Sequence, residues 1–579
     1  MHQYFKNSPG SQGSMKIHKA LLTKGYFPKE LPSVFTTQDF GEQVDDILQD
    51  WEKAGVFRML KLSDELPGGK KRSGAYTYKL GDAEAEKLSK PKRGYERREI
   101  HITHPLPQAL LAREVGANWR SVQRWLSRQT YSVDEIRVGN DYERAIKGIN
   151  FALHEAKKSY LQATSDWVIT TDITRFYPSI YTHSIAWAAY GKERVKRNLN
   201  AYKGSFADRL DLLVRSCNRN QTVGIPVGPE TSRIIAETIS ARIDQSYSAR
   251  FPNSDKDNID RLQDDWMVGI GTLEGAETVL SAISGLYREY GLDINGSKTS
   301  IDRIVGERES AWISEMKAFL SHRSGSLAGS RLREFLELTL ILQSQNPTAS
   351  VVIYALSVVE GAAIKAVDMP LVESFLIKAA VVAPGAMDRI CRVVLDVQNR
   401  TNALSAKRIG SRFIYLVKVA LEKGHHYEAI WLLYTLRGMK RPVDIRSIKE
   451  LLADVESAAI ALILLDMKSK GLCIGKLPTK VWEGKISEDS VKSDWTWLLA
   501  YEAYRHGWMV DHNKLLKKPL FKAMSSRNVV FYDPKRNINT SSSEVGNRST
   551  RRKRNMEEVR KHLENLRGVA EAGHQSGDY

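Results

Sequence analysis

The sequence predicts an α+β domain followed by an all-α domain, and three observations support this. Between Trp167 and Thr299, short apolar runs that lead into or away from carboxylates alternate with segments of helical periodicity. Beyond about residue 330 the strand patterns fade, and one amphipathic segment follows another. A chain of 579 residues also exceeds what one hydrophobic core usually supports. Helices packed against a sheet form the α+β layer, and the later helices form a domain of their own.

The composition divides the chain into four regions. We expect an N-terminal extension over 1–90, the α+β domain over 91–325, a helical domain over 326–535 and a basic tail over 536–579. The spacing of the helical domain is compatible with a solenoid of the HEAT or armadillo kind. No strict internal repeat is evident, so a non-repetitive helical domain remains an alternative. In the tail, a basic cluster at 551–554 precedes an expected helix carrying Val559, Leu563 and Leu566, which we interpret as a solvated end rather than a phosphate-binding arm.

Charge and cysteine content narrow the class of protein. The formal net charge is +18, which is typical of a protein with a polyanionic partner, although it also favours solubility. The three cysteines, Cys217, Cys391 and Cys473, are far apart and form no cluster with histidine, so we expect core residues and no zinc site. The N-terminus lacks the apolar core of a signal peptide, and the apolar run 458–465 is too short to span a bilayer. We expect a soluble intracellular protein.

Asp172 ends the first apolar run of the α+β domain. The residues before it, 167–171, are largely apolar and β-branched, and a helix is expected after Pro178. A carboxylate at the end of a buried strand is costly unless it is paired or binds a metal. The alternative is a helix N-cap, for which Asp is a favoured residue.

A second pair of carboxylates, Asp264 and Asp265, precedes the apolar run 267–270. Adjacent acids are common in turns, so the pair alone is weak evidence. Successive residues of a strand point to opposite faces, and we assign Asp264 to the same point as Asp172, with Asp265 turned away or supporting it. Carboxylates that converge from separate strands are what two-metal phosphoryl transfer requires.

Two further segments complete the series. The loop 224–229 contains Gly224, Pro226 and Gly228, which make it rigid and free of bulk, and it precedes a helix with an isoleucine stripe. Such a loop suits a surface on which a base lies flat. Lys298 follows a helix that Gly291 should end, and its cation is suited to charge stabilisation or proton donation, unless it is an ordinary loop lysine.

The segment upstream of these motifs, 92–165, is strongly basic and helical in periodicity. Its arginines and lysine are Arg97, Arg98, Arg113, Arg120, Arg124, Arg128, Arg144 and Lys147. Trp119 and Trp125 are interleaved with them and are suited to stacking on bases. Their helical spacing among leucines favours a place in the core instead.

Together these segments resemble the palm of reverse transcriptases, and the resemblance covers roughly 95–305. In that family motif A has an Asp followed five residues later by an aromatic, here Asp172 and Tyr177. Motif B corresponds to 224–229, motif C to 263–265 and motif D to 291–299. One departure lies at motif C, where Leu262 and Gln263 stand in place of the usual aromatic, so primer positioning is expected to be unusual. The resemblance implies a right-hand polymerase fold with fingers and palm.

The resemblance also implies a role for each matching residue. Two Mg²⁺ ions are expected on Asp172 and Asp264, with Asp265 nearby and the Ile173 carbonyl as a further ligand. Tyr177 would lie under the sugar of the incoming dNTP and exclude a 2′-hydroxyl. The remaining expected contacts to nucleotide or primer are Arg144 for the triphosphate, Gly224, Pro226, Gly228 and Gln263, with Lys298 as catalytic cation.

No RNase H, maturase or integrase region follows the palm. A palm followed by a helical array is similar to bacterial abortive-infection reverse transcriptases of the AbiK type, and the segment His426–Trp431 adds to this likeness. The resemblance implies anti-phage defence in the bacterial cytoplasm and includes DNA synthesis without a conventional template, primed from a protein hydroxyl. It implies a nucleic-acid partner, including a structured RNA, and a homo-oligomer or second polymerase subunit.

Three other functions are alternatives to an active DNA polymerase. A catalytically silent palm that acts as a nucleic-acid-binding scaffold is disfavoured by the three retained carboxylates. An RNA-synthesising polymerase is disfavoured by Tyr177. A splicing-type mobile-element reverse transcriptase is disfavoured because its maturase region is missing.

Overall fold

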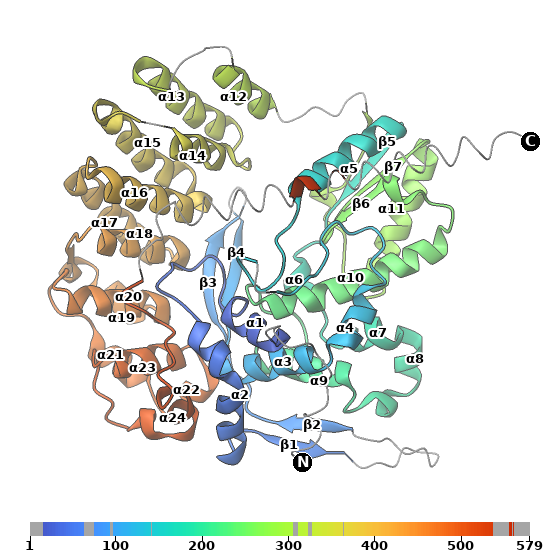
Figure 1. Cartoon of the computed structure of the whole chain (residues 1–579), viewed down its shortest axis with the longest axis horizontal. Helices are drawn as coiled ribbons and strands as arrows, with labels where there is room; N and C mark the ends of the chain where they lie inside the picture. The colour runs from blue at the N-terminus through green and yellow to red at the C-terminus, as the bar shows by residue number, and fades with distance from the viewer. Residues whose placement is uncertain are drawn as a thin grey trace, which may run out of the picture.

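A four-stranded antiparallel sheet lies on one side of the molecule and a long array of helices on the other, with a two-stranded hairpin between them (Figure 1). The computed structural model describes residues 16–62, 75–92, 96–139, 142–304, 311–321, 327–362, 364–536, 555–557 and 560. The basic cluster 551–554 and the expected tail helix positions Val559, Leu563 and Leu566 lie outside the described residues. The structure is a mixed α/β protein, as the sequence predicts.

The strand order in the sheet is β6-β7-β5-β8, with every neighbouring pair antiparallel. The bounds are β5 Trp167–Thr171, β6 Ile259–Leu262, β7 Asp265–Ile270 and β8 Ser300–Arg303. The helices that pack on it include α5 Phe151–Thr164 and α11 Leu273–Arg288. Helix α11 ends close to Gly291, whose φ of +75° is the positive value expected of a glycine stop.

Helix α10 (Glu230–Arg250) follows the glycine-proline loop and buries its isoleucine stripe. The stripe consists of Ile234, Ile235, Ile239 and Ile243, each at most 2 % exposed. This burial confirms the helix and its inward face, because apolar side chains three and four residues apart lie on one side of a helix.

The basic segment upstream of the sheet forms a hairpin and several helices. The elements are β3 Glu86–Pro91, β4 Arg97–Ile102, α3 Pro105–Ala117 and α4 Trp119–Leu126. Within this stretch of helical periodicity, α3 ends and α4 begins at Asn118, whose side-chain amide donates to the Glu114 carbonyl at 3.0 Å. Trp125 is buried and stacks on Phe206 with ring centroids 5.0 Å apart, which confirms its place in the core.

The C-terminal region is helical, with one two-stranded parallel ribbon of β9 (Val443–Asp444) and β10 (Cys473–Ile474) among its described residues. Its helices are α12 Ala311–Ser321, α13 Gly329–Gln345, α14 Val351–Gly361, α15 Met369–Val382, α16 Met387–Thr401, α17 Ala406–Glu422, α18 His426–Gly438, α19 Lys449–Asp454, α20 Ala458–Ser469, α21 Thr479–Lys485, α22 Ser490–Ser493, α23 Thr496–Arg505 and α24 Pro519–Ser525. Neighbouring helices such as α17 and α18 pack on each other, while the HEAT-like repeat stays a prediction.

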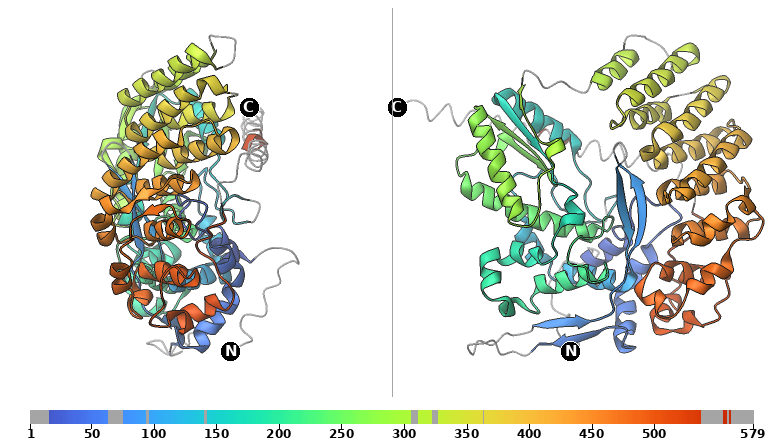
Figure 2. Two further views of the ribbon diagram at one scale, coloured as in Figure 1. Left: turned by 90° about the vertical axis from the view of Figure 1, so that its left-hand side faces the viewer. Right: turned by 180° about the vertical axis from the view of Figure 1, so that it is seen from behind.

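The N-terminal segment packs against α3 on one side and against α24 of the helical array on the other. It contains α1 (Ile17–Thr23), α2 (Gln38–Lys53) and the hairpin of β1 (Arg58–Lys61) with β2 (Tyr76–Lys79). The indole of Trp51 donates to the Leu520 carbonyl at 2.9 Å, which ties α2 to α24. The view from behind shows the blue N-terminal elements against the orange helices (Figure 2). These contacts join the N-terminal segment, the sheet with its helices and the helical array in one continuous core.

All three cysteines are buried and unbridged, as expected of core residues. Among the described residues, every helix falls short of the length and apolar character needed to cross a membrane.

Candidate active site

The register of the sheet brings the predicted carboxylates together. Thr171 of β5 pairs with Trp266 of β7, so Asp172 and Asp265 are next in line at the same end of the two strands. Asp264 lies beside them, in the two-residue turn that joins β6 to β7. Facing residues of antiparallel strands have Cα atoms about 4.5–5.5 Å apart. The three acids that the sequence singled out therefore converge on one edge of the sheet.

A buried arginine holds the β6–β7 turn in place. Gln263, the first residue of the turn, has a φ of +60°, which is unfavourable for a non-glycine residue. The fully buried guanidinium of Arg261 donates to the Gln263 carbonyl at 2.6 Å. It also pairs with Glu237 at 2.6 Å and Asp244 at 2.7 Å, both on α10. This network fixes the turn that carries Asp264.

The sequence analysis missed this network. The available indication was an arginine in the short segment Ile259–Leu262, with two acids seven residues apart on the helix that follows the glycine-proline loop. Seven residues is close to two helical turns, so Glu237 and Asp244 lie on the same face of α10.

Asp264 sits in an environment that opposes its ionisation. Burial raises the pKa of Asp264 to about 7, and the charge of Asp265 adds to the rise. The positive charges of Arg98 and Lys92, on and beside the β3–β4 hairpin, act in the opposite direction. The carboxyl group is therefore short of positive charge, which a bound cation would supply.

Lys298 meets the other predicted ligand directly. Its ammonium forms an ion pair with the Asp172 carboxylate, which is only 7 % exposed. The backbone supports this contact, because Asn295 donates its N–H to the Asp172 carbonyl at 2.7 Å and Ile173 pairs with Ile294 as an isolated bridge. The segment ending at Thr299 thus runs beside the end of β5, as its predicted role requires.

The donor set fits a divalent cation by its chemistry. Carboxylate oxygens are the ligands that Mg²⁺ prefers, and Asp172, Asp264 and Asp265 offer them at the adjoining ends of β5 and β7. No set of three or more His, Cys, Asp or Glu side chains within the described ranges has metal-binding geometry as it stands. The Asp172 carboxylate is engaged by Lys298 in this conformation, so that ion pair has to open before a metal can share the oxygen.

The glycine-proline loop docks on the helix that follows Asp172, which is α6 (Phe176–Ser179). The Ile225 amide donates to the Tyr177 carbonyl at 3.0 Å, and the Gly224 amide donates to the Ile180 carbonyl at 2.9 Å. Gly224 has a φ of +90°, and a Cβ there would lie 3.2 Å from the Pro178 carbonyl oxygen. Only glycine allows this close approach without strain.

Tyr177 lies between this loop and the carboxylates. Burial raises the pKa of the Tyr177 hydroxyl; the nearby Arg233 partly offsets this rise, and the charge of Asp264 adds to it. The ring packs edge-on against Phe176, with centroids 5.7 Å apart. The predicted contact of Tyr177 with the sugar of the nucleotide stays a prediction.

The Arg144 guanidinium is occupied by hydrogen bonds within the protein. Its guanidinium donates to Glu230 at 3.0 Å, to the Phe27 carbonyl at 2.7 Å and to the Gly228 carbonyl at 3.2 Å. Gly228 itself has a φ of +130°, and a Cβ there would lie 2.8 Å from Pro28 Cγ. In this structure Arg144 holds the glycine-proline loop against the N-terminal segment, and its predicted nucleotide contact stays a prediction.

The loop has a second support in β4. The Val227 amide donates to Nδ1 of His101 at 3.0 Å, and the His101 amide donates to the Val227 carbonyl at 2.8 Å. Burial, with the charge of Lys87, lowers the pKa of His101 to about 4. A neutral ring is required here, because the nitrogen that accepts a hydrogen bond cannot carry a proton.

Other predicted contacts have structural partners. The Gln263 side chain donates to Asp134 at 3.3 Å, and Pro226, within the glycine-proline loop, is buried. Arg113 lies over the rings of Phe57 and Tyr78, and Arg128 donates to the Ala188 carbonyl at 2.6 Å. Within the predicted basic stretch, the side chains whose charges act on Asp264 are Lys92 and Arg98, which are both exposed.

Comparison with known proteins gives a distant likeness. No family model and no curated protein matches the chain. Similar solved structures include apo telomerase from Candida tropicalis, at 12 % identity and a TM-score of 0.28 over 77 % of this chain and 76 % of that chain. Telomerases from Candida tropicalis and Candida albicans, each in complex with a TWJ fragment of telomeric RNA, are 12 % identical with TM-scores of 0.26; each match covers 74 % of this chain, and 68 % and 69 % of theirs. The functional evidence is therefore the geometry of the site itself.

Proposed function

We propose that this chain is a reverse-transcriptase-type DNA polymerase that adds deoxynucleotides to a 3′ or protein hydroxyl. The observation that supports this best is the convergence of Asp172, Asp264 and Asp265 at one edge of the sheet. Tyr177, the glycine-proline loop and Lys298 surround the same point. Carboxylates, an aromatic beside them and a cation opposite them are the parts that nucleotidyl transfer needs.

Each residue has a defined task in this proposal. Asp172, Asp264 and Asp265 would hold two Mg²⁺ ions, which supply charge neutralisation and activation of the attacking hydroxyl when bound. Arg98 and Lys92 bind the triphosphate oxygens by charge-assisted hydrogen bonds. Lys298 assists the departing pyrophosphate, either by donating a proton to it or by stabilising its negative charge. Tyr177 excludes a ribose 2′-hydroxyl by its bulk.

The biological setting belongs to the same proposal. The sequence resemblance and the helical array after the palm support an abortive-infection enzyme that acts in anti-phage defence. Synthesis without a conventional template, a structured RNA partner and a second polymerase subunit follow from that resemblance alone.

A second candidate function is a silent palm that binds nucleic acid without catalysis. The ion pair between Lys298 and Asp172 favours it, because a permanent lysine counter-ion would replace the metal at the first carboxylate. This candidate and the polymerase differ in one property, which is magnesium-dependent incorporation of nucleotides.

The test is incorporation of labelled deoxynucleotides by the purified full chain with Mg²⁺, with and without added RNA or DNA. The control is the double variant Asp264→Ala/Asp265→Ala. Product that disappears in the variant supports the polymerase, and a mobility shift after protease treatment supports priming from the protein. Absence of product under every condition, together with retained nucleic-acid binding, supports the silent scaffold instead.

A further inference from the structure

The first turns of α18 contact the β3–β4 hairpin through several consecutive residues. The His426 ring donates from Nδ1 to the Lys87 carbonyl at 3.2 Å, and Lys90 lies 5.1 Å from the centre of the Tyr427 ring. His426 and Tyr427 belong to the segment His426–Trp431, which the sequence analysis identified and which has no role in the proposed chemistry. Trp431 extends the contact to the N-terminal segment, since its indole donates to the Glu30 carbonyl at 2.8 Å.

The strongest of these contacts is an ion pair between Glu428 and Arg97. The guanidinium donates to both carboxylate oxygens, at 2.9 and 2.6 Å, and Glu428 is only 5 % exposed. Arg97 also donates to the Ser89 carbonyl at 2.8 Å, so one side chain joins β4, β3 and α18. A bidentate pair of this kind fixes direction as well as distance.

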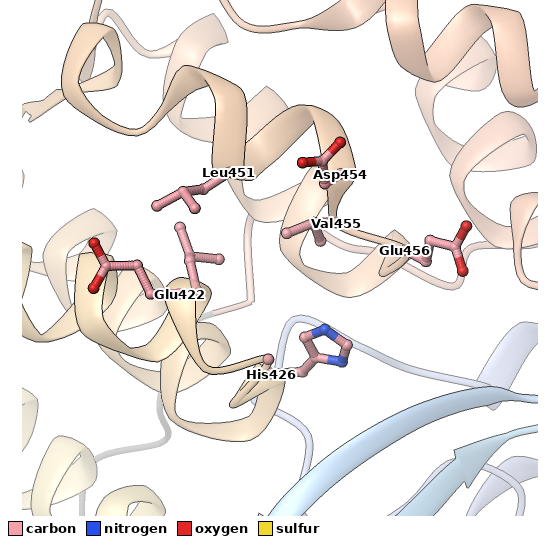
Figure 3. Close-up of a pocket in the computed structure, with 8 residues that line it drawn as sticks. Glu422, His426, Leu451, Asp454, Val455 and Glu456 are labelled. Atoms are coloured by element: carbon pink, nitrogen blue, oxygen red, sulfur yellow. The ribbon is translucent and has the colours of Figure 1, made fainter.

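The other end of β3 is held by the array as well. The Ser457 hydroxyl donates to the buried carboxylate of Glu86 at 2.6 Å, and the Ala459 amide approaches the same oxygen at 3.3 Å. The helical array therefore contacts the hairpin at its base, where Ser457 binds Glu86, and near its tip, where Glu428 binds Arg97. His426 and Glu456, which belong to these two contact regions, line one open pocket beside the pale blue hairpin (Figure 3).

The hairpin links these contacts to the carboxylates. Neighbouring residues of a strand point to opposite faces, so Arg97 and Arg98 project in opposite directions from β4. Arg97 is turned to α18, and Arg98 carries the charge that acts on Asp264. The geometric connection runs along β4, because His101 exchanges two hydrogen bonds with Val227 of the glycine-proline loop, at 3.0 and 2.8 Å. The strand that carries Arg98 is thus held to α18 through Arg97 and to the loop beside the carboxylates through His101.

We propose that the segment His426–Trp431 is a latch by which the helical array positions the β3–β4 hairpin for nucleotide binding, with Glu428 as its positioning residue. The inference rests on the proposed polymerase function, because it assigns the triphosphate to Arg98 and Lys92. It gives the helical array a task in that reaction: displacement of the first turn of α18 withdraws Arg98 from the site and weakens nucleotide binding without changing the carboxylates.

The test compares Glu428→Gln with Glu373→Gln in the full chain. Glu373 is a matched control, because it is a buried glutamate of the array that pairs with Arg408 at 3.1 Å and accepts from the Ser405 amide at 2.6 Å. Glu428→Gln is expected to raise KM for the deoxynucleotide about tenfold and to leave kcat within about twofold, since one charged hydrogen-bond pair is lost. Glu373→Gln is expected to leave both constants unchanged.

Hydrogen exchange of the β3 and β4 amides supplies a readout that does not need activity. Faster exchange in Glu428→Gln than in Glu373→Gln supports the latch, and recovery of KM in Arg97→Glu/Glu428→Arg supports the pairing itself. Equal KM values or equal exchange rates in the two single variants overturn it. If the wild-type chain incorporates no nucleotide, the polymerase proposal fails, while the exchange rates still decide whether α18 holds the hairpin.

Discussion

The Lys298 ammonium lies on the carboxylate of Asp172, so the turn before β8 provides a counter-ion to the acid that ends β5. Asp172 is nearly buried, and a buried carboxylate without a partner would be strongly unfavourable. The lysine therefore stabilises the Asp172 carboxylate electrostatically, and a metal that binds this carboxylate has to compete with the lysine for it. This relationship makes Lys298 a competitor of the metal as well as a candidate proton donor.

The first prediction concerns this competition. Lys298→Met should increase the affinity for Mn²⁺ several-fold, because the carboxylate no longer has an internal cation. The same variant should lower kcat by about 10²-fold if the ammonium assists pyrophosphate departure. Mn²⁺ binding is measured by electron paramagnetic resonance of the free ion, and kcat by nucleotide incorporation. Lys407→Met, on the exposed side of α17, is the control, and unchanged Mn²⁺ affinity in Lys298→Met would rule out the competition.

The second prediction concerns sugar selection. Tyr177→Gly should raise the ratio of ribonucleotide to deoxynucleotide incorporation by about tenfold or more, because a steric clash worth about 1.4 kcal/mol changes a rate ratio tenfold. The measurement is kcat/KM for each matched pair of nucleotides. Phe176→Leu is a suitable control, since Phe176 is buried beside Tyr177 and should affect stability rather than the ratio. An unchanged ratio in Tyr177→Gly would show that the ring does not contact the sugar.

The third prediction concerns the pH dependence of stability. The pKa of His101 falls from 6.5 in the unfolded chain to about 4 in the fold, because the ring is buried near Lys87. Between these values the unfolded chain binds more protons, so stability rises with pH and is lost as pH falls from about 6.5 towards 4. The contribution of this histidine amounts to about 3 kcal/mol, at about 1.4 kcal/mol per pKa unit.

His101→Gln tests this contribution, because an amide oxygen can accept the Val227 N–H without titrating. Between pH 7 and pH 4 the free energy of unfolding of the wild type should fall by about 3 kcal/mol more than that of the variant. The comparison has to be differential, because burial also lowers the pKa of His104 to about 4. Parallel pH profiles for the two proteins would contradict a neutral His101 in the fold.

The predictions from sequence succeeded where the information is local. The isoleucine stripe of α10, the glycine stop after α11 and the two strands that end at Asp172 and begin at Asp265 all follow from periodicity within a few residues. The same local rules placed Trp125 in the core correctly. They failed at Asn118, where a single polar residue ends one helix and begins the next.

The contacts that the sequence did not reveal join residues far apart in the chain. Arg144 meets the Gly228 carbonyl across 84 positions, and Arg97 meets Glu428 across 331. Composition identifies a basic stretch, and no local pattern tells which arginine faces a carbonyl, a helix or a substrate. The sequence therefore could not reveal that Arg144 binds Glu230 and the carbonyls of Phe27 and Gly228.

The fourth prediction concerns the turn that carries Asp264. Arg261→Gln should lower the free energy of unfolding by about 3–5 kcal/mol, because it leaves Glu237 and Asp244 buried without their cation. Replacing the whole set by neutral residues, Arg261→Met/Glu237→Gln/Asp244→Asn, should recover much of that loss, since no uncompensated charge remains. Urea denaturation measures both changes.

Arg288→Gln is the matched control, because Arg288 pairs with Asp293 at 3.4 Å with both side chains more than two-thirds exposed. Its effect should stay below about 1 kcal/mol. The triple variant separates stability from catalysis: it should fold yet lose activity, since Gln263 keeps its φ of +60° only while the Arg261 guanidinium holds its carbonyl. Full activity in the triple variant would mean that the turn positions Asp264 without the arginine.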